Sequence, residues 1–427
     1  MEPPSASHPV GELLLDTVWD DLAADEAEAL RGTPTGSKAA RGAWALRSKS
    51  KVAVVLTGTP INRNIDDLGR LVAFARGDAS IFDGGRGGVR LSTLFDMATE
   101  EGLAGLRDAL GPTVFRRATS EATGQMPQVT PHVVMLDPSG AELALDQAAR
   151  GELKRVYEEL VALMDEAAEL NPESAEYAEA AQQLREARGA WLGGTTLARQ
   201  AASDPAALLG AHSTAADLLA AQGVIAAATA RPGTKRTAAI ADVTDRVANG
   251  EKVLVFTEFS TVARGLIADL DAAGVRVGQV LGGGGKRRDA DVAAFQAGDL
   301  DALVLTSSGE KGLNLQAATT LVHYDLPWTP KGVLQRTGRA RRLASDNDAI
   351  NVVFYVLRGT IDERVATLVV TRAVEAMRAL DTSRGLSLEQ TDLGSAFSGL
   401  TEAAAATREG RQQSVLLEVT RQLVADS

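Results

Sequence analysis

The sequence predicts an α/β fold in which a parallel sheet is flanked by helices. Short apolar runs enriched in β-branched residues are KVAVVL (51–56), KVLVF (252–256), ALVLT (302–306), TLVHY (320–324) and INVVFYV (350–356). Between 252 and 356 these runs alternate with helical segments such as TVARGLIADLDAAG and RDADVAAFQAG. Apolar strands separated by helices are typical of a parallel sheet buried on both faces. We therefore expect a complete α/β domain over residues 236–384.

The rest of the chain predicts three further regions. Residues 1–120 contain one or two convincing strands, too few for a doubly wound sheet, so we expect a partial α/β domain there. Residues 121–235 are expected to form a helical bridge, because apolar residues recur three and four apart through 137–190 and RPGT (231–234) ends the pattern. The tail, 385–427, is amphipathic and is expected to be helical.

Composition excludes several classes of chemistry. The 427 residues include no cysteine, and the four histidines are never at metal-ligand spacing, which argues against disulfides, thiol nucleophiles and zinc sites. No apolar run approaches the roughly 18 residues of a membrane span and no secretory signal is recognisable, so we expect a soluble, cytoplasmic protein. Of the formal net charge of −12, residues 137–190 contribute −8 from 13 acidic and 5 basic side chains. The acidic total therefore leaves room for a local basic cleft elsewhere.

Candidate functional residues follow the predicted strands. Ligands of open α/β sheets bind beyond the carboxyl ends of the strands, so these segments matter most. They are TGTP (57–60), SSGEKGLNLQ (307–316), DLPW (325–328) and VLQRTGRARR (333–342).

The last segment contains four arginines, and we expect it to be helical. Arg339 and Arg342 are three apart and would share a face of that helix. Two guanidiniums on one helix turn suit the charge that develops on a transferred phosphate. A solvated basic helix, or contacts with a nucleic-acid backbone, explains the same spacing equally well.

An acidic pair, Asp25 and Glu26, lies in WDDLAADEAEAL before an amphipathic segment. In a hydrolase for magnesium-bound nucleotides, one such carboxylate holds the metal through its waters and the next orients the attacking water. Taken alone, DEAE is more often part of an acidic surface helix.

The order of these motifs resembles the Swi/Snf family of helicase-superfamily-two DNA-dependent ATPases. DEAE is followed by LTGTPINRNIDDL, VFRRATSEATGQMPQVTPHVV, TTLARQAASDPAALL, KVLVFTEFSTVARGLIADL, LTSSGEKGLNLQAATTLVHYDLPWTP, QRTGRARR and GTIDERV. The resemblance extends over residues 18–380. It implies a partial first RecA-like lobe, a helical bridge and a whole second RecA-like lobe. In that family the two lobes sandwich ATP, and their opening and closing moves the protein along double-stranded DNA.

The resemblance also implies roles for individual residues. Asp25 and Glu26 would be the magnesium and water residues, and Arg339 and Arg342 the catalytic arginine fingers. The residues placed near ATP are Gly312, Asn314, Gln335, Arg336 and Gly338. The residues placed along the nucleic acid or in coupling are Thr57, Gly58, Thr59, Arg288, Ser307, Ser308 and Lys311.

The chain departs from the family at the phosphate-binding loop. That loop needs Gly-x-x-x-x-Gly-Lys-Ser/Thr after a strand, and neither GTPTGSK (32–38) nor GGGGKRR (282–288) fits this pattern. We therefore expect a carboxy-terminal portion of an ATPase whose phosphate loop comes from a separate chain. A non-catalytic DNA-binding or regulatory subunit that keeps the fold is the alternative, and so is a truncated gene product or a misplaced start codon.

Overall fold

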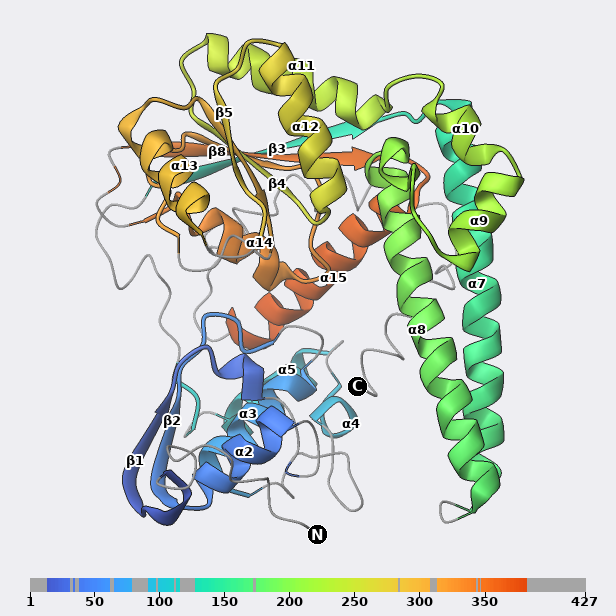
Figure 1. Ribbon diagram of the computed structural model, residues 1–427. Helices are drawn as coiled ribbons and strands as arrows, with labels where there is room; N and C mark the ends of the chain where they lie inside the picture. The colour runs from blue at the N-terminus through green and yellow to red at the C-terminus, as the bar shows by residue number, and fades with distance from the viewer. Residues whose placement is uncertain are drawn as a thin grey trace. The chain divides into compact units, whose positions relative to one another are not determined.

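The computed structural model divides the chain into two units (Figure 1). The first comprises residues 1–122, 329–331 and 371–393, and the second comprises 123–328, 332–370 and 394–427. The structure describes residues 14–30, 34, 38–61, 65–78, 91–96, 99–110, 113–115, 127–171, 174–282, 285–307, 313–342, 345 and 347–381. The predicted tail lies outside the described residues.

The first unit is built on two parallel strands, β1 (Trp19–Ala24) and β2 (Ser50–Val55), with Leu22 opposite Ala53. Its helices are η1 (Ala27–Leu30), α2 (Lys38–Arg47), α3 (Asp66–Arg76), α4 (Leu91–Leu94) and α5 (Glu100–Leu110). The core comprises Ile61, Ile65, Leu68, Val72, Ala73, Leu91, Leu106 and Leu110. Among the described residues of this unit, the strands are β1 and β2, and the sequence led us to expect one or two.

The second unit contains a six-stranded parallel sheet in the order β3-β8-β7-β4-β6-β5. The strands are β3 (Gln128–Leu136), β4 (Val253–Thr257), β5 (Val277–Val280), β6 (Ala302–Thr306), β7 (Thr320–His323) and β8 (Ala349–Leu357). Every residue of β4, β6 and β7 is buried, which confirms the prediction of a parallel sheet covered on both faces. The α/β fold class is thus confirmed.

Helices cover this sheet and extend beyond it. The helices that contact its strands are α11 (Thr234–Ala248), α12 (Ser260–Ala272) and α13 (Lys286–Ala297). Helices α14 (Pro330–Thr337) and α15 (Ile361–Asp381) belong partly to the second unit and partly to the first. On one face, Ala239 and Val243 of α11 and Leu266 of α12 meet Val255 of β4 and Tyr355 of β8 in one core cluster. Among the described residues, no helix is long and apolar enough to span a membrane.

The segment expected as a helical bridge contains a long hairpin, α7 (Gly140–Glu169) and α8 (Ala175–Ser203), seen as two adjacent green helices in Figure 1. It is followed by η2 (Pro205–Leu208), α9 (Thr214–Ala221) and α10 (Val224–Thr229). The same segment also contains β3, which pairs with β8 along its whole length. The edge strand of the second sheet therefore comes from residues ahead of the predicted domain over 236–384.

Candidate functional site

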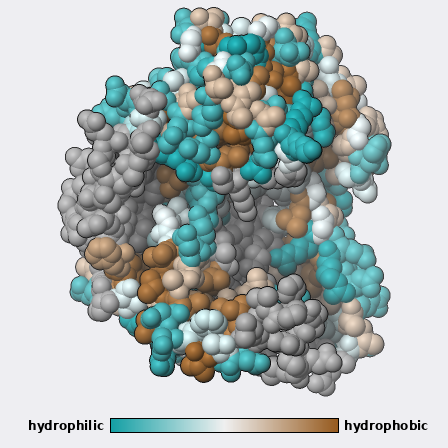
Figure 2. All heavy atoms as spheres, turned by 60° about the vertical axis from the view of Figure 1, so that its left-hand side comes forward, coloured by the Kyte–Doolittle hydropathy of each residue, from teal (hydrophilic) through white to brown (hydrophobic). Residues whose placement is uncertain are grey.

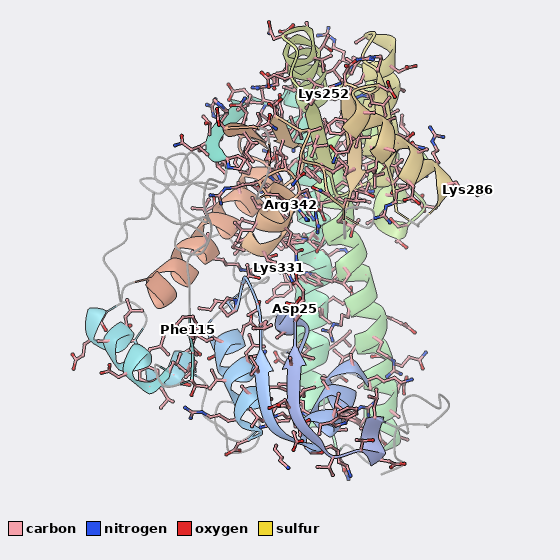
Figure 3. All side chains as sticks on the ribbon, turned by 90° about the vertical axis from the view of Figure 1, so that its left-hand side faces the viewer. Asp25, Phe115, Lys252, Lys286, Lys331 and Arg342 are labelled. Atoms are coloured by element: carbon pink, nitrogen blue, oxygen red, sulfur yellow. The ribbon has the colours of Figure 1, made fainter. Side chains whose placement is uncertain are left out.

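The acidic pair of the first unit lies at the carboxyl end of β1. Asp25 follows the last residue of that strand, as Figure 3 shows. The parallel pairing brings the end of β2 beside it, because Leu56 N donates to Ala24 O (2.8 Å) and Ala27 N donates to Leu56 O (3.0 Å). The structure thus places the acidic pair next to the residues that open the Thr-Gly-Thr-Pro segment.

The backbone is strained at the acidic pair. Glu26 has a φ of 50°, in the left-handed region that residues other than glycine rarely adopt. Its backbone N–H donates to Asp25 Oδ1 (2.8 Å). Both side chains are exposed. Backbone strain at a sequence-predicted acidic residue is the kind of local departure that functional sites show.

The acidic pair fits a magnesium ion held largely through water. Mg²⁺ prefers one or two carboxylates and keeps several waters, in place of a cage made only of protein ligands. Asp25 and Glu26 supply exposed carboxylates, although Glu26 Oε2 also accepts from Lys331 Nζ (3.0 Å). Among the described residues no cluster of three or more acidic or histidine ligands exists to form such a cage. A pair of carboxylates is compatible with a metal that keeps most of its waters.

The coupling segment after β2 forms a short turn. Thr59 N donates to Thr57 Oγ1 (3.1 Å), which folds the Thr-Gly-Thr sequence back on itself. Gly58 is exposed, and a Cβ at this position would meet nothing within 4 Å. The turn is therefore accessible.

In the second unit the two predicted fingers converge on one atom. Arg339 Nη1 and Arg342 Nη2 donate to Leu313 O at 3.4 and 3.2 Å, and Leu315 N donates to Arg339 O (3.0 Å). Leu313 lies between Gly312 and Asn314 of the segment after β6. Figure 3 labels Arg342, just beyond α14. The structure thus brings together the predicted fingers and part of the predicted ATP-binding segment.

The helical prediction for this arginine segment is wrong beyond its first half. Helix α14 ends at Thr337, and the next bonds, Arg339 N to Arg336 O (3.0 Å) and Ala340 N to Thr337 O (3.2 Å), are tighter turns. Gly338 explains this end, since glycine loses more conformational freedom in a helix than other residues. Arg339 and Arg342 therefore meet through a loop and not on one helix face.

Arg336 has a different environment from the other two arginines. It is 1% exposed, donates Nη1 to Asp325 O (2.9 Å) and forms an ion pair with Glu258. Its guanidinium carbon lies 5.4 Å from the Phe256 ring centroid. Within this unit Arg336 thus connects α14 to the loops that follow β4 and β7.

The remaining predicted residues are dispersed. Arg288 lies on α13 and is partly buried, while Lys286 opens that helix and is exposed, as Figure 3 shows. Asn314 O accepts from Gln296 Nε2 (2.8 Å). Ser307 directly follows β6, and Gln335 is partly buried on α14. Ser308, Lys311 and Gly312 lie outside the described residues.

Sequence reasoning missed a buried ionic cluster behind Arg336. Lys235 Nζ lies 2.9 Å from Asp362 Oδ2 and 3.5 Å from Asp325 Oδ1, and its side chain is 1% exposed. Burial raises the pKa of Asp362, and the Lys235 ammonium opposes that shift. The motifs GTIDERV and DLPW contain the two acids, but nothing in the sequence pairs them with a lysine 127 residues before Asp362.

Comparison with known families defines the class of protein. The SNF2-related domain matches residues 9–159, and the helicase conserved C-terminal domain matches residues 235–344. The two matches occur in the order that the motifs predict and together cover more than half of the chain. The chain therefore belongs to the Swi/Snf-type proteins of helicase superfamily two, which confirms the resemblance.

Individual relatives match over shorter segments. The chain is 29% identical over 118 residues to the uncharacterized ATP-dependent helicase YqhH of Bacillus subtilis, covering 28% of this chain and 21% of the helicase. It is 38% identical over 78 residues to the defense against restriction protein B of Escherichia phage P1, covering 18% and 4%. A solved structure, the Sulfolobus solfataricus SWI2/SNF2 ATPase core in complex with dsDNA, is similar with a TM-score of 0.36 and 19% identity over 93% of this chain and 74% of that one. The chain thus spans about a fifth of the helicase and less of the phage protein.

Proposed function

We propose that this chain is the carboxy-terminal part of an ATP-dependent motor that moves along double-stranded DNA in the cytoplasm, and that a separate chain supplies the phosphate loop. The observation that supports this most is the convergence of Arg339 and Arg342 at Leu313 O (3.4 and 3.2 Å). Family membership makes ATP the expected nucleotide and Mg²⁺ its metal.

The acidic pair supplies the hydrolytic chemistry of the first unit. Asp25 would hold Mg²⁺ through water, and Glu26 would orient and deprotonate the water that attacks the terminal phosphate. A bound Mg²⁺ supplies charge neutralisation on the phosphate oxygens. Exposed carboxylates at the carboxyl end of β1 suit both roles.

The arginines of the second unit supply positive charge for the same reaction. A guanidinium remains charged at every working pH and binds phosphate oxygens through parallel N–H groups. Arg339 and Arg342 both donate to Leu313 O in this structure, at 3.4 and 3.2 Å. A transferred phosphate is a stronger acceptor than that carbonyl because it is ionised.

The loop that binds the phosphates of ATP is expected to lie outside these residues. The 427 residues contain no Gly-x-x-x-x-Gly-Lys-Ser/Thr sequence. Backbone amides and the lysine of such a loop hold the β- and γ-phosphates. Without it we expect this chain to hydrolyse no ATP by itself.

ATP hydrolysis with and without a loop-bearing polypeptide tests the proposal. The pure chain is assayed with duplex DNA, alone and with the product of the adjoining upstream reading frame, if that product contains a Gly-Lys-Thr loop. We expect turnover in the mixture only, and Arg339→Ala is expected to lower it by about 10³–10⁵-fold. Arg188→Ala, an exposed arginine on α8, is the matched control and is expected to leave turnover unchanged.

Several outcomes would contradict the proposal. Turnover by the chain alone would exclude the need for a separate phosphate loop. An unchanged rate in Arg339→Ala would exclude the finger assignment. DNA binding without turnover in any mixture would favour the non-catalytic subunit.

The DNA interaction is tested by its salt dependence. A motor that follows the phosphate backbone binds largely without regard to sequence, and its affinity falls as counterions compete. We expect log Kd for duplex DNA to rise linearly with log salt and to be similar for unrelated sequences. Binding that is sequence-specific and insensitive to salt would overturn this part of the proposal.

A further inference from the structure

The carboxyl end of α8 is fixed to the second sheet by one arginine. Arg199 Nη2 donates to Leu326 O (2.5 Å). The guanidinium carbon lies 4.8 Å from the Trp328 ring centroid and 5.5 Å from that of Phe259. Phe259 is 9% exposed and precedes α12, and Trp328 precedes α14. The planar guanidinium therefore contacts two rings and a carbonyl from two different loops.

A second contact fixes the same helix end to the same loop. Tyr324 Oη donates to Ser203 O (2.8 Å), and both residues are buried. Tyr324 begins the segment 324–328 that follows β7, which we term the β7 turn. The hairpin α7–α8 thus has two attachments, four residues apart on α8, to one turn of the second unit.

The β7 turn in turn holds α14. The backbone carbonyl of Asp325, next to Leu326, accepts a hydrogen bond from Arg336 Nη1 (2.9 Å). Its carboxylate accepts from Thr257 Oγ1 and from Glu258 N (3.3 Å). Arg336 also pairs with Glu258. A continuous series of contacts therefore runs from Arg199 through the β7 turn to the helix that precedes Arg339 and Arg342.

Arginine is the residue type that these contacts require. Its planar group stacks on rings, and the cation–π attraction strengthens when the pair is desolvated. A charged donor to a carbonyl is also stronger than a neutral one. Lysine keeps the charge but has no plane to place against Trp328 and Phe259.

We propose that Arg199 is a positioning residue that ties the α7–α8 hairpin to the β7 turn and thereby fixes α14 and the arginines after it. The two attachments lie four residues apart near the carboxyl end of α8. A displacement of this end of α8 would therefore also move the β7 turn. The consequence for catalysis rests on the proposed function, whereas the mechanical link does not.

Hydrogen exchange of the full chain tests the link without any activity. In Arg199→Gln we expect the amides of 325–342 to exchange about ten-fold faster, and those of β4 and β6 to stay unchanged. Arg199→Lys is expected to show the same increase because it lacks the planar group. Arg188→Gln, on the exposed face of α8, is the control and is expected to match the wild type.

Two results would overturn the link. Unchanged exchange over 325–342 in Arg199→Gln would show that Arg199 does not hold the turn. An equal increase throughout the second sheet would show a general loss of stability. If the amides of 325–342 exchange as slowly in Arg199→Lys as in the wild type, the requirement for the planar group is wrong.

Kinetics then test the positioning role. In the reconstituted ATPase, Arg199→Gln is expected to lower kcat at least about ten-fold while KM for ATP changes less than about two-fold, because the fingers act on the transition state. An unchanged kcat would overturn the positioning role. If the wild-type mixture has no activity, the proposed function fails, and hydrogen exchange still decides whether Arg199 holds α14.

Discussion

At the scale of single residues, His323 is the clearest buried titratable group outside the site. It lies on β7 with 0% exposure, between Phe354 (4.9 Å between ring centroids) and Phe256 (5.9 Å). Within the described structure neither ring nitrogen finds a hydrogen-bond partner. Burial, assisted by the nearby Arg336 charge, lowers the pKa of His323 well below its usual value. The imidazole is therefore neutral in the folded chain and serves as an aromatic core residue.

This environment predicts a pH dependence of stability. A histidine with a depressed pKa stabilises the fold above its unfolded pKa of about 6.5, and that contribution is lost as the pH falls, because the unfolded chain then binds the proton. When the pH is lowered from 7.5 to 5.5, the unfolding free energy of both proteins is expected to fall. We expect the fall to be about 1.4 kcal/mol smaller in His323→Leu than in the wild type. Urea denaturation at both pH values measures the difference.

The matched control is His212→Gln, because His212 is exposed. It is expected to keep the wild-type dependence on pH. Equal losses in His323→Leu and the wild type would show that His323 titrates normally in the folded chain.

At the scale of elements, one carboxylate joins the starts of two helices. Glu142 Oε2 accepts from Ser139 N (2.8 Å) in the capping box that begins α7. The same side chain accepts from Thr234 N (2.7 Å) and Thr234 Oγ1 (2.5 Å) at the start of α11. Burial alone would raise the pKa of Glu142, but the hydrogen bonds from Thr234 and Ser139 together lower it. An ionised acceptor thus satisfies N–H groups that helix starts leave without intrahelical partners.

Removing this carboxylate is expected to be costly. Glu142→Ala leaves the N–H groups of Ser139 and Thr234 without their acceptor in a largely buried site, so we expect a loss of about 3 kcal/mol of unfolding free energy at pH 7. Glu158→Ala, on the exposed face of the same helix, is expected to change it by less than about 0.5 kcal/mol. Denaturation of both variants provides the comparison, and equal effects would contradict the capping role.

Elements could be predicted from the sequence where burial leaves a periodic signal. The apolar runs at 252–256 and 302–306 became β4 and β6, because strands buried on both faces must be apolar throughout. Strand β3 was harder, since its place at the sheet edge depends on pairing with β8 more than 200 residues later. Helix α14 ends at Thr337 because Gly338 follows it. The prediction of a longer helix gave more weight to the arginine spacing than to this glycine.

The site could be predicted as a set of segments but not as a set of contacts. Motif order identified the residues that follow β1, β6 and α14, and the structure brings Arg339 and Arg342 to Leu313. The position of Arg336 near ATP, which the same motif implies, stays a prediction. Its buried ion pair with Glu258, 78 residues away in sequence, was not predicted. Such a partner depends on tertiary folding, because no local pattern pairs residues so far apart.

At the scale of the whole molecule, the two units differ in how well their sheets are covered. Val52, Val54 and Leu56 of the first unit are each about half exposed (52%, 51% and 51%). Figure 2 shows hydrophobic side chains gathered on the surface of this unit. Parallel strands are normally buried on both faces, as β4 and β6 are in the second unit. The first unit is therefore expected to open more readily than the second.

Two matched substitutions and hydrogen exchange test this difference. Val54→Thr in β2 changes a half-exposed side chain, so we expect less than about 0.5 kcal/mol of destabilisation. Val255→Thr in β4 places a hydroxyl at a site that is 1% exposed, so we expect about 1–3 kcal/mol of destabilisation.

Hydrogen exchange compares the two strands directly. In the wild type, amides of 50–55 should exchange at least about 100-fold faster than those of 253–257, relative to their intrinsic rates. Adding the loop-bearing polypeptide of the proposed function should slow exchange in 50–55 and leave 253–257 unchanged, because a segment that completes the first unit would cover this valine face. Equal protection of the two strands in the chain alone would show that β2 is already as well covered as β4.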